Sequence, residues 1–174
     1  SKVALNRLED EVESTCEQEQ TFRDDLLNLL KAENIKLQDY VVVDACKGVG
    51  TCLLLLLEGG ARWGVLSRPA EECEDLILYY NLGGVARVAC IAEQTGLSQE
   101  VDSFIHTGTK LLVLSDRGFS AIEEIADYGA CSHVLLIEEG PTIEDSADFN
   151  LVGRFSMKCM GETLEFSFFS RSGA

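Results

Sequence analysis

The segment VVVDACKGVGT, residues 41–51, holds the residues whose types and spacing are best suited to chemistry. Three valines run into Asp44, and Gly48 and Gly50 follow, with Cys46 ahead of them. Glycines in such a turn let the backbone approach a bound nucleotide closely, because no Cβ intervenes and positive φ is accessible. The same turn can simply connect a strand to a helix, so this segment alone leaves the cofactor open.

Other polar side chains also follow apolar runs. Ser67, Glu93, Asp116 and Glu138 come after ARWGVL, RVACIA, KLLVLS and SHVLLI. In an open sheet of parallel strands, ligands bind at the edge where the carboxyl ends of the strands meet. We therefore expect four acids that follow predicted strands to converge on that edge: Asp44, Glu93, Asp116 and Glu138.

The apolar pattern predicts the elements that must position these residues. Strands are expected at 40–46, 61–67, 86–93, 110–116 and 132–140, and helices at 21–35, 51–60, 68–84, 98–108 and 120–130. Strands that alternate with helices predict a parallel sheet covered on both faces. Two further strands, 149–160 and 163–171, are separated by GE and predict a terminal hairpin. The expected fold is α/β, a three-layer αβα sandwich whose mostly parallel seven-stranded sheet ends in an antiparallel β-hairpin.

This order of elements resembles the class I S-adenosylmethionine-dependent methyltransferases, a Rossmann-like family. The resemblance covers roughly residues 22–170, with 21–174 as a single methyltransferase-like domain after an acidic tail or helix at 1–20. The family's turn is commonly [DE]-x-G-x-G-x-G. Here the acid and the last two glycines match, and a cysteine replaces the first glycine, which makes this a divergent member.

The resemblance implies a role for each residue of the turn and of the strand ends. Asp44 would receive the amino group of S-adenosylmethionine, directly or through water, and Asp116 would orient the methyl acceptor or take its proton. Ser67 stands where the family has an acid for the ribose hydroxyls, and Glu93 would face the adenine amino group or be an ordinary solvated residue. The expected cofactor-binding residues are Asp44, Cys46, Gly48, Gly50, Ser67 and Glu93, and the expected catalytic residue is Asp116.

Two alternative assignments stay open at this point. A dinucleotide site would need Gly or Ala where Leu53 stands, although Arg68 could accommodate the 2′-phosphate of NADP. A ribose 2′-O methyltransferase would need a Lys-Asp-Lys-Glu tetrad, for which the sequence offers Lys36, Asp116, Lys158 and Glu165 at poor spacing.

Composition limits the compartment and the partners. The net charge of −16 opposes unassisted binding to phosphate backbones, so we expect nucleic acid to bind only with help from a basic partner or domain. Seven cysteines without a C-x-x-C pair, together with two histidines, favour reduced thiols and no metal site. No apolar run approaches the ~18 residues that cross a bilayer. We expect an intracellular protein, cytoplasmic or nuclear, with no membrane contact.

Two functions follow from the resemblance. The first is S-adenosylmethionine-dependent methyl transfer to an acceptor, RNA or protein rather than a small molecule, as part of a larger protein or complex. The alternative is a catalytically inactive methyltransferase-like domain that serves as a structural or binding subunit, for example in RNA modification. The substituted glycine and the missing ribose acid favour this alternative.

Overall fold

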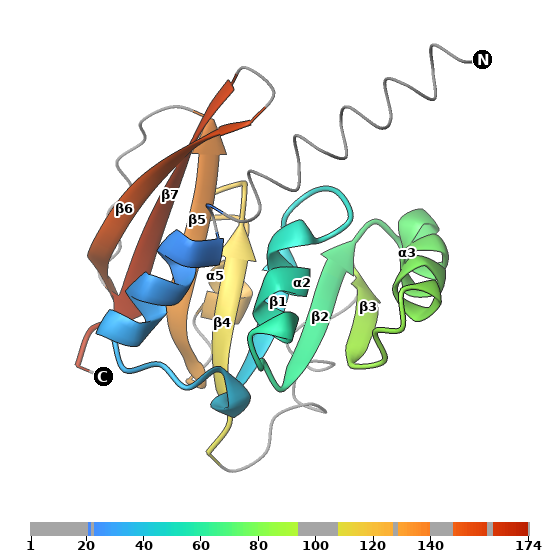
Figure 1. The fold of residues 1–174 in the computed structure, drawn as a ribbon, viewed down its shortest axis with the longest axis horizontal. Helices are drawn as coiled ribbons and strands as arrows, with labels where there is room; N and C mark the ends of the chain where they lie inside the picture. The colour runs from blue at the N-terminus through green and yellow to red at the C-terminus, as the bar shows by residue number, and fades with distance from the viewer. Residues whose placement is uncertain are drawn as a thin grey trace.

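The structure is a computed structural model that describes residues 21, 23–93, 108–126, 129–139, 148–159 and 162–173. Its centre is one seven-stranded sheet with the order β3-β2-β1-β4-β5-β7-β6 (Figure 1). The strands are β1 (Tyr40–Ala45), β2 (Trp63–Arg68), β3 (Val88–Ala92), β4 (Lys110–Ser115), β5 (Cys131–Glu139), β6 (Phe149–Cys159) and β7 (Glu162–Arg171). The described helices are residues 23–32, the short 3₁₀ helix η1 (Leu37–Asp39), α2 (Thr51–Glu58), α3 (Ala70–Leu82) and α5 (Glu123–Ala126).

The first five strands pair in parallel, β7 pairs antiparallel to β5, and β6 pairs antiparallel to β7. β7 lies between β5 and β6, because it pairs with β5 on one side and forms the hairpin with β6 on the other. The predicted architecture, a mostly parallel sheet that ends in an antiparallel hairpin, is confirmed. The predicted helix at 98–108 and the predicted tail at 1–20 lie outside the described residues, apart from Gly108, which is in a turn.

Alternate residues of the central strands enter two separate cores. Val42 and Leu66 pack with residues 23–32, α2 and α3 on one face, while Val43 and Val65 pack with α5 on the other. This follows from the period of two along a strand, which sends successive side chains to opposite faces. The result is the expected three-layer sandwich, with the carboxyl ends of β1–β5 at a common edge (Figure 1).

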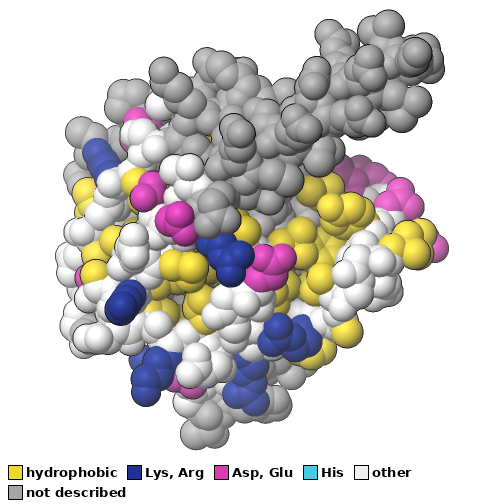
Figure 2. Space-filling view, viewed as in Figure 1, with side chains coloured by type: hydrophobic (Ala, Val, Ile, Leu, Met, Phe, Trp, Pro, Cys, Tyr) yellow, Lys and Arg dark blue, Asp and Glu magenta, His cyan; other side chains and the backbone are white. Residues whose placement is uncertain are grey.

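The surface seen from the side of α2 carries mixed charge. Figure 2 shows Lys and Arg side chains scattered across this face, with apolar side chains between them. On α3, Leu78, Tyr79 and Leu82 are exposed. No helix in the described part of the chain is long and apolar enough to cross a membrane.

Candidate functional site

The glycine turn lies at the carboxyl edge of the sheet, between the end of β1 and the start of α2. Gly48 and Gly50 have φ of +87° and +82°, values that L-residues with a side chain rarely adopt. A Cβ on Gly48 would meet no atom within 4 Å, whereas one on Gly50 would overlap Tyr80 Oη and lie 2.9 Å from Leu66 Cδ2. Gly48 therefore borders open space, and Gly50 is required by close packing below the turn.

Two side chains hold the turn from beneath through its carbonyl oxygens. Arg68 Nε donates to the carbonyl of Gly48 at 2.9 Å. Tyr80 Oη lies 2.6 Å from the carbonyl of Val49 and 3.1 Å from that of Gly50, so its single proton is shared between them. Three consecutive carbonyls are thus satisfied by β2 and α3, and the turn has a fixed shape before any ligand is present.

Asp44 is buried and forms an ion pair with Arg68. Asp44 Oδ1 accepts from Arg68 Nη2 at 3.0 Å and from the backbone N–H of Cys46 at 2.9 Å, and each side chain of the pair is 1% exposed. Arg68 Nη1 donates to the carbonyls of Asp44 and Ser67. Burial raises the pKa of the Asp44 carboxyl, while the guanidinium and the N–H of Cys46 oppose that rise.

The ion pair bears on two expectations from the sequence. Asp44 Oδ1 already accepts from Arg68 and from the N–H of Cys46, and the role of Asp44 toward the amino group of a ligand stays a prediction. The prediction that Arg68 could face a 2′-phosphate is wrong, because its guanidinium is buried beneath the turn rather than exposed at the edge.

A pocket of about 360 Å³ opens above the turn. Its lining includes Asp44, Cys46, Gly48, Gly50, Asp116 and Ile137.

Asp116 follows β4, and its Oδ2 accepts from the backbone N–H of Lys47 at 2.8 Å, which ties the two loops together. Its other oxygen, Oδ1, is buried and has no hydrogen-bond partner among the described residues. Arg117 Nε lies 3.9 Å from that oxygen, an ion-pair distance without a hydrogen bond. Asp116 thus places a carboxylate at the wall of the pocket, with Oδ1 itself covered from solvent.

A smaller hollow of about 250 Å³ lies further along the same edge, between the start of α3 and the end of β3. It is lined by Pro69, Ala70, Glu71, Ala92 and Glu93. Arg117 Nη2 lies 3.2 Å from Glu93 Oε1, so this acid is paired with a guanidinium as Asp44 is, although here both side chains are partly exposed.

Ser67 is buried in β2, between two residues that face the turn. Leu66 and Arg68 contact the turn, and strand alternation turns Ser67 toward the opposite face with Val65. The predicted ribose contact of Ser67 gains no support from this position.

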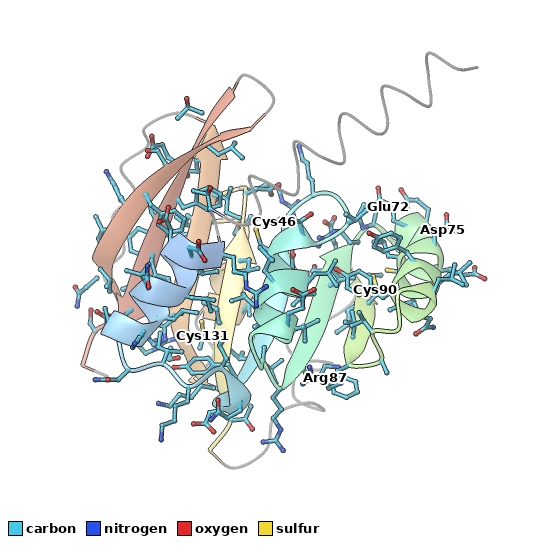
Figure 3. The ribbon with its side chains drawn as sticks, in the orientation of Figure 1. Cys46, Glu72, Asp75, Arg87, Cys90 and Cys131 are labelled. Atoms are coloured by element: carbon cyan, nitrogen blue, oxygen red, sulfur yellow. The ribbon has the colours of Figure 1, made fainter. Side chains whose placement is uncertain are left out.

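Cys46 lies at the top of β1, beside the pocket (Figure 3). Burial and the neighbouring carboxylate of Asp44 raise the pKa of its thiol far above the usual range. Because the thiolate is the nucleophilic form, Cys46 acts here as a small apolar wall of the pocket.

The tetrad considered from the sequence does not assemble. Lys36 precedes η1 and the start of β1, which places it at the opposite edge of the sheet from Asp116. Glu165 lies in β7, where its carboxylate accepts from Ser156 Oγ at 2.8 Å, and Lys158 is paired across the hairpin with Thr163. Glu138 likewise stands in the β5–β7 ladder opposite Glu165, and its neighbour Ile137 lines the pocket.

Sequence reasoning missed the contributions of Tyr80, Leu66 and Arg117. Leu76 and Tyr80 have the i, i+4 spacing of a buried helix face, which predicts burial but not contact with a turn 30 residues away. Arg117 directly follows Asp116, the predicted catalytic acid. Its contact with Glu93 depends on the positions of β3 and β4 in the sheet. In the described part of the chain, no group of three or more His, Cys, Asp or Glu side chains could hold a metal ion.

No family model matches the sequence, and no curated protein matches it. Comparison of the three-dimensional structure finds many proteins of similar fold. Magnesium protoporphyrin IX methyltransferase from Synechocystis PCC 6803, solved with bound S-adenosylhomocysteine, is 12% identical, with a TM-score of 0.62 over 92% of this chain and 86% of that one. The protein yhhF from Escherichia coli, assigned as a methyltransferase, is 18% identical, with a TM-score of 0.60 over 87% of this chain and 84% of that one.

A third neighbour is PH1948 from Pyrococcus horikoshii, assigned as an RNA methyltransferase. It is 13% identical, with a TM-score of 0.56 over 87% of this chain and 84% of that one. The chain is thus a doubly wound α/β protein with a terminal hairpin and a pocket at the carboxyl edge of its sheet. More specifically, it has the class I methyltransferase fold, at the low identity expected of a divergent member.

Proposed function

We propose that this chain is an S-adenosylmethionine-dependent methyltransferase. The observation that carries the proposal is the pocket above Gly48 and Gly50, whose wall includes the carboxylate-bearing residue Asp116. Neighbours of the same fold were solved with S-adenosylmethionine or S-adenosylhomocysteine bound, which supports this cofactor.

The residues present fit the methionine half of the cofactor. The Cβ-free surface at Gly48 admits close approach of a ligand to the turn. When bound, the cofactor would supply a methyl group made electrophilic by its sulfonium. The fit at the nucleoside half is weaker, because Ser67 stands where the family has a carboxylate for the ribose, and Glu93 is paired with Arg117.

The chain's own contribution to the transfer would be position and electrostatics. Arg68 and Tyr80 fix the carbonyls of the turn, so the pocket needs little rearrangement when a ligand enters. Asp116 is held by the N–H of Lys47, and its carboxylate would orient the acceptor or take the proton that the acceptor loses. Orientation of the two reactants is the main source of rate in such a transfer.

The acceptor we propose is RNA or protein rather than a small molecule, met as part of a larger protein or complex. The net charge of −16 and the scattered Lys and Arg of Figure 2 support a basic partner for any nucleic-acid substrate. The neighbour PH1948, assigned as an RNA methyltransferase, gives the RNA acceptor further support by analogy of fold.

The test is transfer of a radiolabelled methyl group from S-adenosylmethionine to total RNA or to protein extract. Wild-type chain should label one of these fractions, and Asp116→Asn should reduce the rate at least tenfold, since general acid–base or orienting groups contribute about 10²–10⁴-fold. Glu58→Gln is the matched control, because this exposed acid lies at the far end of α2 from the pocket and should leave the rate unchanged. Equal labelling by wild type and Asp116→Asn would contradict the role of Asp116.

A second candidate function has its own supporting observation. The buried Asp44–Arg68 pair supplies the acid with a cation from the chain itself, which favours a non-catalytic methyltransferase-like subunit. In that case neither S-adenosylmethionine nor S-adenosylhomocysteine binds, and the same labelling experiment gives no product with any fraction.

A further inference from the structure

Two thiols outside the pocket lie unusually close together. Cys90 Sγ donates to Cys73 Sγ at a sulfur–sulfur distance of 2.9 Å. Cys73 belongs to the start of α3 and Cys90 to β3, so the contact joins a helix to the strand beneath it (Figure 3). A disulfide bond is about 2.05 Å long, so under ~1 Å of approach separates these thiols from a covalent link.

Both thiols are open to a small reagent. Each side chain is partly exposed, whereas Cys131 is fully buried in the core. β3 stands at one edge of the sheet and pairs with β2, so no further strand of the described sheet covers its outer side. The two cysteines are free thiols in this structure.

The chemistry assigns different roles to the two sulfurs. Burial and the hydrogen bond to Cys73 raise the pKa of the Cys90 thiol to about 12, so at neutral pH it stays protonated. Because Cys90 Sγ donates its hydrogen bond to Cys73 Sγ, we assign Cys73 as the first attacking sulfur and Cys90 as the second. A thiolate is the form that attacks a disulfide.

We propose that Cys73 and Cys90 are a redox-active pair that forms a reversible intramolecular disulfide by exchange with a small-molecule disulfide such as oxidised glutathione. Cys73 attacks one sulfur of glutathione disulfide and releases one glutathione thiol. Cys90 then loses its proton and attacks the Cys73 sulfur of the mixed disulfide, which releases the second glutathione. Two protein thiols are oxidised, and one glutathione disulfide is reduced to two thiols.

The bond would act on the smaller hollow of the carboxyl edge. Pro69, Ala70 and Glu71 form one wall of this hollow at the start of α3, and Ala92 and Glu93 form the other at the end of β3. Cys73 and Cys90 lie within a few residues of these two walls, so the disulfide fixes the distance between them. Oxidation thereby sets the width of the hollow, independently of whether a methyl donor binds at the larger pocket.

The sequence makes the bond easy to detect. Trypsin cleaves after Arg62, Arg87 and Lys110, and Arg68 is protected by the following proline, so the two cysteines fall in separate fragments, 63–87 and 88–110. Each fragment contains a single cysteine. The full chain would be equilibrated with mixtures of reduced and oxidised glutathione, alkylated, digested and analysed by mass spectrometry.

The expected result is a linked pair of these fragments, lighter than their sum by two hydrogen atoms, that appears as oxidised glutathione increases and disappears on reduction. Cys73→Ser and Cys90→Ser should each abolish the link, and Cys16→Ser should leave it intact. Circular dichroism checks that each variant is folded. The peptide analysis of the wild-type chain tests the proposal even without the variants. Alkylation of both fragments at every glutathione ratio, a link to another cysteine, or glutathione adducts alone would overturn the proposal.

Discussion

Arg68 Nη2 lies 3.0 Å from Asp44 Oδ1, and neither side chain has more than 1% of its surface exposed to solvent. The pair joins the carboxyl ends of two adjacent strands directly beneath the glycine turn. It also explains why an arginine ends β2: its three donor groups reach the carboxylate of Asp44 and the carbonyls of Asp44, Ser67 and Gly48. The turn of this chain is thus built on a charge pair contained within the protein.

Replacement of one partner of this pair alone should strongly destabilise the folded protein. Asp44→Asn leaves a buried guanidinium without a counter-charge, and Arg68→Gln leaves a buried carboxylate. Each should lower the free energy of unfolding by about 3–5 kcal/mol, as measured by urea denaturation.

The double variant supplies the control for this prediction. Asp44→Asn with Arg68→Gln has no buried charge, so it should lose clearly less than the sum of the two single changes. A coupling free energy of about 2 kcal/mol or more is expected. Additive losses, or single losses under about 1 kcal/mol, would show that the two charges do not depend on each other.

The two glycines of the turn should respond differently to alanine. Gly48→Ala adds a methyl group in open space and should cost about 1–2 kcal/mol, the strain of a positive φ. Gly50→Ala bears the same strain and also overlaps Tyr80 Oη and Leu66, so it should cost roughly 1–3 kcal/mol more. Urea denaturation of the two variants gives the comparison, and equal losses would mean that the turn is not packed against α3 as described.

Tyr80→Phe should loosen the turn without unfolding the protein. The change removes the one hydroxyl that reaches the carbonyls of Val49 and Gly50, while the ring stays buried. We expect a loss of about 1–3 kcal/mol, the cost of a buried group left without its partner. Hydrogen exchange should quicken at the amides of residues 47–51 and of α2. Tyr79→Phe, at the exposed neighbouring position, is the control and should change neither quantity.

His133 should make stability fall in mild acid. Its pKa is lowered from 6.5 to about 4, first by burial and second by the charge of Lys110. Between these values the unfolded chain binds a proton that the folded chain does not, so this contribution is fully present above pH 6.5 and is lost as the pH falls toward 4. Between pH 7.5 and 5 the loss should reach about 2 kcal/mol.

His133→Phe isolates this contribution, because a phenyl ring can keep the stacking on Phe168. The variant and the wild type share their other titrating groups. The difference between their unfolding free energies should therefore shift by about 2 kcal/mol from pH 7.5 to pH 5. A constant difference across this range would mean that His133 titrates normally in the folded protein.

The sequence was sufficient to predict the strands and a mostly parallel sheet with a terminal hairpin, because periodicity and turn residues are local signals. The run YVVVDA predicts a buried strand, the Gly pairs after α2 and α3 end those helices, and the absence of a helix between 149–160 and 163–171 predicts the hairpin. The positions of Asp44, Gly48, Gly50 and Asp116 at one pocket also follow from strand order.

The contacts within the site could not be predicted in the same way. Arg68 belongs to a strand end where either an exposed or an inward guanidinium is compatible with the sequence, and its direction depends on the acid one strand away. Ser67 and Leu66 differ by one position, and that single step decides which residue faces the turn. The closeness of Cys73 and Cys90 depends on how α3 lies over β3, which periodicity does not specify.

The most direct test of the central claim is calorimetric titration of the full chain with S-adenosylhomocysteine. If the pocket above the turn is a methyl-donor site, one equivalent should bind saturably, and Asp116→Asn should bind with about the wild-type affinity, because Asp116 is assigned to the methyl acceptor and not to the donor. Glu58→Gln should bind as the wild type does. No binding heat at millimolar ligand, with the chain folded, would contradict the methyltransferase proposal and leave the non-catalytic subunit as the function that the Asp44–Arg68 pair supports.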